Sequence, residues 1–192
     1  MPVSSRIKTG DRELIQIVDA AMAEAARKSG AWLVCKPGCA SCCVGLFAIS
    51  QLDAFRLRQG LAELGASDPE RAGRVRARAL QAASGISQAF PDGGVSRILA
   101  SQTGDNDPCP ALDTETGTCD LYASRPITCR TFGPPVRCGS EAVGICELCF
   151  EGASDAEIAS CEVEVDPGGL EATLIHELEE PEPTLVAFAL AG

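Results

Sequence analysis

The sequence predicts a mainly α fold with irregular cysteine-rich loops: a small metal-stabilised domain with flanking helices. Apolar residues recur at helical spacing near both ends of the chain. The segment 101–152 shows hardly any periodic apolar pattern, and 11 cysteines occur in 192 residues. Hydrophobic residues include 28 alanines, and only eight residues are aromatic. Because such small side chains bury little apolar surface, we expect bound metal to hold the fold.

Helix signals appear in order from the N-terminus. Between Asp11 and Lys28 the apolar residues share one helical face, and Gly30 follows as a stop. Two capping sequences, the second with an early proline, then predict a helix over about 49–64 and another over about 68–88. These two helices form an insertion within the cysteine-rich region.

Two further helix signals follow the middle segment. A capping sequence begins at Ser154, ahead of a helix that presents Cys161, and helical spacing resumes from Leu170 to Leu178 before Pro181. One short strand is expected over about 44–49. The expected parts of the chain are an N-terminal helix over 1–30, a cysteine-cluster metal-binding domain over 31–167 and an acidic helical tail over 168–192.

Charge is unevenly distributed along this acidic chain. The net charge is −11, and the 55 residues after Arg137 carry 13 acidic groups and no Lys or Arg. A solvated acidic face is the simpler interpretation, and a docking surface for a protein partner is the alternative. The third expected helix carries a basic stripe that consists of Arg71, Arg74, Arg76 and Arg78. This stripe is expected either to pack against the acidic C-terminal segment or to bind a ligand. One basic helix is too little for nucleic acid, so no such partner is expected.

The chain is expected to be cytoplasmic and to have no membrane partner. The run Leu185–Leu190 is far shorter than the roughly 20 residues that span a bilayer. No apolar run follows Arg6 and Lys8, so a secretory signal is not indicated.

In a reducing compartment, 11 cysteines are poorly explained as disulfides. Metal binding is therefore the leading interpretation.

The first cysteine group places four thiols within nine residues, on a turn made tight by Pro37 and Gly38. Its members are Cys35, Cys39, Cys42 and Cys43. Thiolates repel one another, so such close grouping is hard to explain without a cation. At least three of these thiols could reach one metal centre.

The second group consists of Cys109, Cys119 and Cys129, which follow one another at ten-residue intervals on separate turns. Ligands from separate turns can close a tetrahedral zinc site or hold the corners of an iron–sulfur cluster. Arg125 and Arg130 flank the last cysteine. They either offset the charge of a thiolate centre or form ordinary ion pairs with acidic residues.

The third group is a C-x-x-C knuckle, Cys146 and Cys149, followed by Cys161. Together the three groups offer ten cysteines, enough for one or two centres. Cys138 stands alone in a Gly/Ser loop and is the favoured free thiol, although its role as a ligand stays open. His176 is expected to be a solvated helical residue.

At these residues the chain resembles the YkgJ-type cysteine-cluster family, a zinc- or iron-chelating domain. The motifs that carry the resemblance are Cys35-x3-Cys39-x2-Cys42-Cys43, Pro108-Cys109-Pro110-Ala111-Leu112, Cys119-Asp120-Leu121-Tyr122 and Arg125-Pro126-x-x-Cys129-Arg130-Thr131-Phe132. The resemblance implies a bacterial cytoplasmic protein, often described as containing an iron–sulfur cluster. The ligands that it implies are Cys35, Cys39, Cys42, Cys43, Cys109, Cys119 and Cys129, with at least one of Cys146 and Cys149.

The expected function is metal binding: the clustered thiolates chelate zinc or iron, with an iron–sulfur cluster as one form of the centre. The alternative is an iron–sulfur oxidoreductase or an accessory factor in protein modification, because a similar domain occurs in flagellin lysine methylases. The first cysteine group also has radical S-adenosylmethionine spacing, but the alternating strands and helices of that barrel are missing. A thioredoxin-like use of the knuckle lacks its βαβ context. Whether the protein is an enzyme stays open, since no catalytic constellation accompanies the metal site.

Overall fold

The computed structural model describes residues 4–91, 93–101, 104, 106–139 and 141–192. It confirms the mainly α class, with eight α-helices in the described part of the chain and short strands between them. Backbone contacts divide the chain into two compact units. Unit 1 consists of the chain up to Lys36 together with Ile127–Glu180, and unit 2 consists of Pro37–Pro126 together with Pro181–Gly192.

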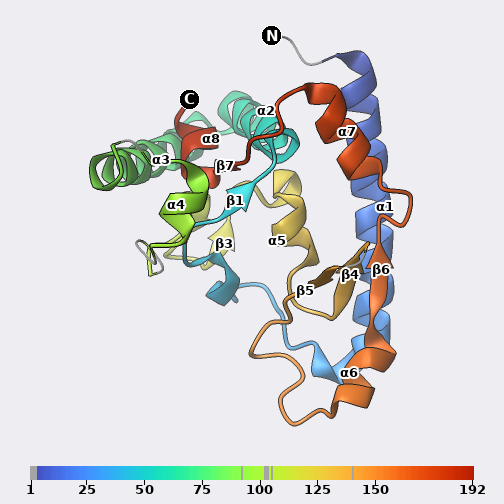
Figure 1. The fold of residues 1–192 in the computed structure, drawn as a ribbon. Coiled ribbons are helices and arrows are strands. Elements are labelled where there is room, and N and C mark those ends of the chain that lie inside the picture. Colours follow the sequence, from blue (N-terminus) through green and yellow to red (C-terminus); the bar gives the residue numbers. More distant parts are fainter. Residues whose placement is uncertain (1–3, 92, 102–103, 105, 140) are drawn as a thin grey trace. The chain divides into compact units, whose positions relative to one another are not determined.

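Unit 1 is organised along its long first helix, α1 (Figure 1). The other helices of this unit and the strand β6 pack on α1. The elements are α1 (Ser5–Ser29), α5 (Ile127–Thr131), β4 (Val136–Cys138), β5 (Glu141–Val143), α6 (Asp155–Cys161), β6 (Val163–Val165) and α7 (Leu170–Leu178).

The predicted N-terminal helix is present and begins earlier than the apolar pattern indicates. Ser4 accepts a 3.2 Å hydrogen bond from the backbone N–H of Ile7 and so caps the first turn. Leu14 and Val18 on the predicted face are completely buried. Gly30 ends the helix with a positive φ of 51°, as expected of a glycine stop.

A three-stranded sheet, which the sequence did not indicate, completes unit 1. Its strand order is β5-β4-β6, with β4 antiparallel to β5 and parallel to β6. Val136 pairs with Val163 in the parallel ladder. A parallel pair needs a long connection, and the one here contains the Cys146–Cys149 knuckle and α6. The sheet therefore positions the third cysteine group.

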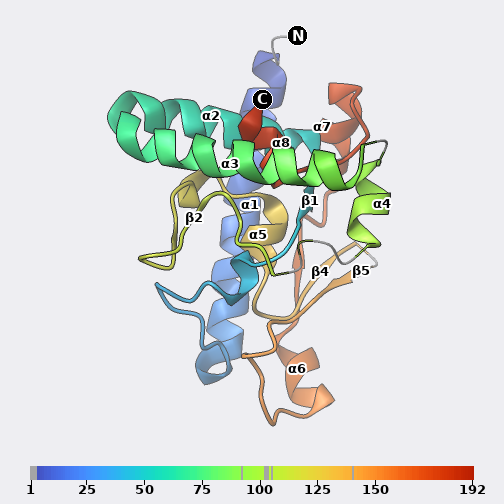
Figure 2. The same cartoon turned by 90° about the vertical axis from the view of Figure 1, so that its left-hand side faces the viewer.

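Unit 2 is built on a helical hairpin. In Figure 2, α2 and α3 lie side by side with the short C-terminal helix α8 against them. The elements are β1 (Ala48–Ile49), α2 (Gln51–Ser67), α3 (Pro69–Ala89), α4 (Val95–Leu99), β2 (Leu112–Asp113), β3 (Thr118–Cys119), β7 (Thr184–Leu185) and α8 (Val186–Ala191).

Both helices of this hairpin begin where the sequence predicted. The Ser50 hydroxyl accepts from the backbone N–H of Asp53, at 3.1 Å. The Asp68 carboxylate accepts from the N–H of Arg71, at 3.0 Å, with Pro69 as the first helical residue. The two helices share an apolar core that includes Leu57.

The last residues of the chain form part of this core. Strand β7 pairs antiparallel with β1, so that Thr184 lies opposite Ile49. Val186, Ala189 and Leu190 of α8 are buried against the hairpin. The sequence predicts an acidic helical tail over 168–192, and its six-residue apolar run is too short to display a helical period that would indicate burial. None of the described helices combines the length and the apolarity that crossing a membrane requires.

Replacing Leu190 by Ala tests the role of α8. Leu190 is 2 % exposed, and the cavity left by its side chain should lower the free energy of unfolding by about 2–5 kcal/mol. Leu80→Ala on α3 is the control, since Leu80 is 56 % exposed and its truncation should cost no more than about 0.5 kcal/mol. Urea unfolding followed by circular dichroism measures both. Equal stability of the two variants would contradict a core role for α8.

Candidate metal centre

The vicinal cysteines and the Pro-Cys-Pro turn are held together by their backbones in unit 2. Cys109 donates its N–H to the carbonyl of Cys43 at 2.8 Å, and Gly45 donates to the carbonyl of Asp107 at 2.8 Å. These bonds flank an antiparallel bridge between Val44 and Pro108. Residues 66 positions apart in sequence are thereby fixed side by side.

The β2–β3 hairpin adds Cys119 to this group. Leu112 pairs with Cys119 across the hairpin, and the N–H of Leu112 donates to the carbonyl of Cys109 at 2.8 Å. Asp120 donates its N–H to Ala111 at 2.7 Å. One chain of backbone hydrogen bonds therefore connects Cys43, Cys109 and the Cys119 strand.

A close approach of two glycines places the loop of Cys39 against the same hairpin. Gly117 has φ 67°, and a Cβ there would lie 2.7 Å from the Gly38 carbonyl oxygen. Only glycine fits both the conformation and the contact. Cys39 follows Gly38 directly, so its half-buried side chain belongs to the same region of unit 2.

The adjacent thiols of Cys42 and Cys43 have pKa values that are shifted in opposite directions. A hydrogen bond with Cys43 lowers the pKa of Cys42 to about 6, against the opposing effect of burial, and Arg125 lowers it further. The same hydrogen bond raises the pKa of Cys43, together with burial and the nearby thiols of Cys109 and Cys119. At neutral pH, Cys42 is thus a thiolate that accepts a hydrogen bond from the Cys43 thiol.

The two other thiols of this group remain protonated at neutral pH. Burial raises the pKa of Cys109 to about 11, and burial also raises the pKa of Cys119. Each of these pKa values is raised further by the charge of a neighbour, which is Cys119 for Cys109 and Asp120 for Cys119. Several thiols that disfavour one another's ionisation are the donor set that a soft cation would stabilise.

The donor set fits zinc or iron by its chemistry, because thiolate sulfur is a preferred ligand of both. Among the described residues, no three Cys, His, Asp or Glu side chains are already placed so that they could hold one metal ion together. Rotating a cysteine from one rotamer to the next moves its sulfur by about 3 Å. Side-chain rotation on a fixed backbone is therefore the kind of movement that binding would require.

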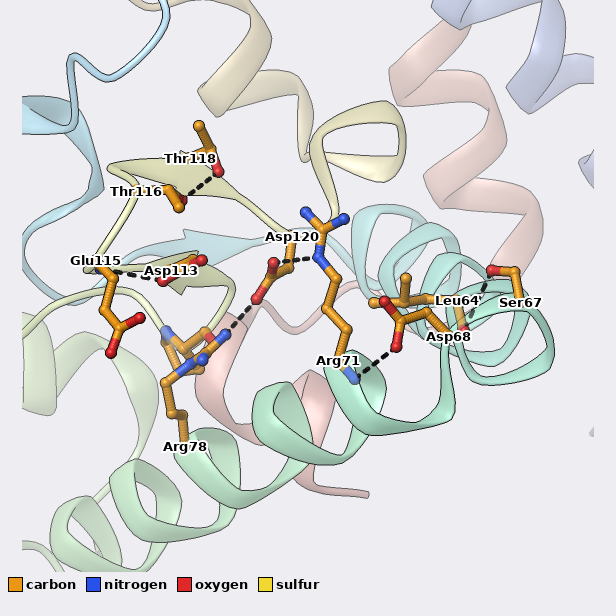
Figure 3. Close-up of polar contacts among 11 residues, drawn as sticks. Leu64, Ser67, Asp68, Arg71, Arg78, Asp113, Glu115, Thr116, Thr118 and Asp120 are labelled. Carbon is orange, nitrogen blue, oxygen red and sulfur yellow. Dashed lines mark hydrogen bonds and ion pairs between the residues drawn. The ribbon is translucent and has the colours of Figure 1, made fainter.

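A buried carboxylate anchors the Cys119 strand to α3 (Figure 3). Asp120 accepts a 2.5 Å hydrogen bond from Arg71 and another of 2.5 Å from Arg78, and its side chain is only 2 % exposed. Arg78 also donates to the carbonyl of Pro110 at 2.8 Å. These two arginines of the predicted basic stripe therefore pair with the cysteine loops. The alternative that they pack against the acidic C-terminal segment was wrong for both, because residues seven positions apart lie on one face of α3 and their long side chains converge on the Asp120 carboxylate.

The two arginines around Cys129 have different partners. Arg125, in unit 2, stacks its guanidinium over the Tyr122 ring at 3.9 Å and lowers the pKa of Cys42. Arg130, in unit 1, pairs with Asp19 of α1 at 2.9 Å. One arginine thus acts on a thiol of the cysteine group, and the other forms an ion pair within its own unit.

The remaining predicted site residues lie in unit 1. The sulfur of Cys35 is 4.0 Å from that of Cys149, and Cys146 and Cys161 are buried in the same cluster. Cys129 is half-buried on α5, and Cys138 is half-buried on β4. None of the 11 cysteines forms a disulfide. His176 is exposed on α7.

Asp120 and its arginine partners were not among the predicted site residues. The signal was present in the sequence, because Asp120 directly follows Cys119 and two arginines on α3 stand seven residues apart. A spacing of seven residues puts both arginines on one helix face. Only the position of the hairpin reveals that the carboxylate meets this face.

A family model described as "Putative zinc- or iron-chelating domain", named CxxCxxCC, matches residues 34–149. The chain belongs to this family. The match covers well over half of the chain and includes every member of the first two cysteine groups and the knuckle. Metal binding is the function that membership of the CxxCxxCC family supports, with zinc or iron as the metal. No curated protein and no solved structure matches the chain.

Replacing Asp120 by Asn tests the anchor. The neutral amide loses the charge-assisted hydrogen bonds to both arginines, and the free energy of unfolding should fall by about 1–3 kcal/mol. Glu115→Gln is the control, since Glu115 is exposed in the same hairpin and should change stability by less than about 0.5 kcal/mol. Urea unfolding measures the difference. An Asp120→Asn protein as stable as the control would show that the arginines do not anchor the loop.

Metal affinity should increase with pH. The raised pKa values of Cys43, Cys109 and Cys119 mean that these thiols hold their protons at neutral pH. Each proton that binding displaces should raise the apparent affinity about tenfold per pH unit below the pKa of its thiol. Competition with a chelator of known pH dependence, from pH 6.5 to 8.5, measures this slope.

Cys109→Ser gives the matched comparison, because it removes one of the protons that binding displaces. Its slope should be about one unit lower than that of the wild type. An apparent affinity that does not change with pH in the wild type would contradict the protonated state of these thiols.

Proposed function

We propose that unit 2 binds a zinc or iron centre through the thiolates of Cys42, Cys43, Cys109 and Cys119, with Cys39 beside them, and that the metal holds these loops in place. The observation that carries the proposal is the backbone pairing of Cys43 with Cys109. It brings the vicinal cysteines of the family motif against the Pro-Cys-Pro turn. Cys129 remains a predicted ligand, supported by the family motif alone.

Binding energy supports a role for the metal in the fold. The loop of residues 106–126 contains strands of only two residues, and the loop of residues 37–47 is joined to it by an isolated bridge, so backbone pairing alone offers these loops little stability. Structural zinc sites contribute about 10–16 kcal/mol of apparent binding free energy, which appears as folding free energy. A metal shared by these loops would therefore supply most of their stability.

Nearby arginines support a centre with excess negative charge. Four thiolates around a divalent ion leave a net charge of −2. Arg125 acts on Cys42, and Arg71 and Arg78 act on Cys119 and Cys109, respectively, all in the direction that favours the thiolates. Guanidinium groups around a ligand shell tune its charge in this way.

Metal content tests the proposal directly. Protein purified without oxygen should contain zinc or iron, and its acid-labile sulfide and visible spectrum identify the form of the centre. Iron with matching sulfide and a broad band near ~400 nm indicates an iron–sulfur cluster, whereas zinc without colour indicates a mononuclear thiolate site. Protein that contains neither metal would refute the proposal.

Variants locate the centre. Cys109→Ser and Cys119→Ser should each bind the metal of unit 2 more weakly, so that the purified variants contain less of it and melt at a lower temperature. Cys138→Ser is the matched control, because it removes a half-buried cysteine outside unit 2 and should retain the metal. Unchanged metal content in both Cys109→Ser and Cys119→Ser would exclude these residues as ligands.

A further inference from the structure

Unit 1 contains a second concentration of thiols, which the centre in unit 2 does not use. Cys146, Cys149 and Cys161 are 6 %, 4 % and 6 % exposed and form one buried cluster. Trp32 packs against this cluster and stacks with Phe150 at 6.1 Å between ring centroids. Three buried thiols thus share one apolar cluster with two aromatic residues, which limits their exposure to water.

The backbone fixes the knuckle from two sides. Within the knuckle, Cys149 donates its N–H to the carbonyl of Cys146 at 2.8 Å. Cys146 itself donates to Gly133 at 3.2 Å, and Phe150 donates to Trp32 at 3.3 Å. The knuckle therefore has a preformed turn, which is the backbone arrangement that a C-x-x-C metal ligand pair requires.

Cys35 brings a third sulfur to the knuckle from the segment that follows α1. Its sulfur lies 4.0 Å from that of Cys149. Four sulfurs bound tetrahedrally to zinc at about 2.3 Å stand about 3.8 Å from one another. Gly133, at φ 130°, adjoins this sulfur, and a Cβ there would lie 3.5 Å from it. The Cys35–Cys149 contact thus already has close to the spacing of two zinc ligands.

Cys161 supplies a fourth sulfur from the last residue of α6. Its thiol donates to the carbonyl of Lys28 at 3.3 Å, in the last turn of α1. It lies beyond residue 149, where the match to the CxxCxxCC family ends. A fourth ligand at this position would therefore belong to this chain and not to the family motif.

We propose that unit 1 binds a zinc-type divalent ion through Cys35, Cys146 and Cys149, with Cys161 as the fourth ligand. Each thiol gives its proton to solvent as its sulfur binds the metal, so the ion replaces the S–H contacts now present. The proposal rests on the thiolate chemistry of the proposed function but not on the centre in unit 2. The two sites draw on different cysteines and can be tested separately.

Cobalt(II), incorporated by growth in cobalt-supplemented medium, is the probe, and Trp32 is the reporter. Trp32 is the only tryptophan in the chain and packs against the unit 1 thiols. Cobalt in this cluster should quench its emission relative to the same protein grown with zinc. The Cys109→Ser/Cys119→Ser protein should keep one cobalt and the quenching, whereas Cys146→Ser/Cys149→Ser should lose both. Equal Trp32 emission in cobalt-grown and zinc-grown wild type would overturn the proposal.

Cys161→Ser tests the fourth ligand in the background that lacks the unit 2 thiols. The thiolate-to-cobalt absorption should fall by about a quarter when three of four thiolates remain. An unchanged band would remove Cys161 from the site. If the Cys109→Ser/Cys119→Ser protein lost all its metal while the Cys146→Ser/Cys149→Ser protein kept its metal, the unit 2 centre would be supported and the unit 1 site excluded.

Alkylation of the wild-type protein gives a test that does not depend on the folding of a variant. Cys35 is exposed in the structure, so burial cannot protect it from iodoacetamide. In zinc-loaded protein, peptide mass spectrometry should find Cys35 labelled slowly, and a chelator should accelerate its labelling together with that of Cys146 and Cys149. A labelling rate for Cys35 that is the same with and without chelator would overturn the proposal.

Discussion

The hydrogen bond between the backbones of Cys43 and Cys109 is the contact on which the arrangement of unit 2 depends. It joins the vicinal cysteines to a turn far along the chain, and that turn is joined in the same way to the strand of Cys119. Burial raises the pKa values of Cys109 and Cys119, and the charge of Cys119 raises that of Cys109 further. The backbone thus holds together thiols that are costly to ionise, and a bound metal cation would stabilise their thiolate forms.

The helical part of unit 2 gives these loops a rigid support. The helices α2, α3 and α8 share one apolar core, and α3 reaches from it to the cysteine loops through Arg71 and Arg78. Because Asp120 is buried, its charge depends on both arginines for solvation. The helical core and the cysteine loops of unit 2 are therefore connected by ion pairs as well as by the polypeptide chain.

Much of the fold could be predicted because its long helices carry local signals. Ser50 and Asp68 cap α2 and α3 through their own side chains, and the face of Leu14 and Val18 repeats every three to four residues. The sheet of unit 1 and α8 carry no such signals. Strands of three residues and a helix of six are too short to show a period, and only their pairing or burial stabilises them.

The family, the thiol chemistry and the cysteines concerned can all be inferred from the amino-acid sequence, because ligand type and spacing are local properties of the chain. Which thiols are neighbours emerges from the folded structure alone. Cys35 belongs to the first motif by sequence but contacts Cys149, and Asp120 finds its partners on α3. Such contacts depend on how turns with little regular structure pack against helices, and no spacing along the chain encodes that packing.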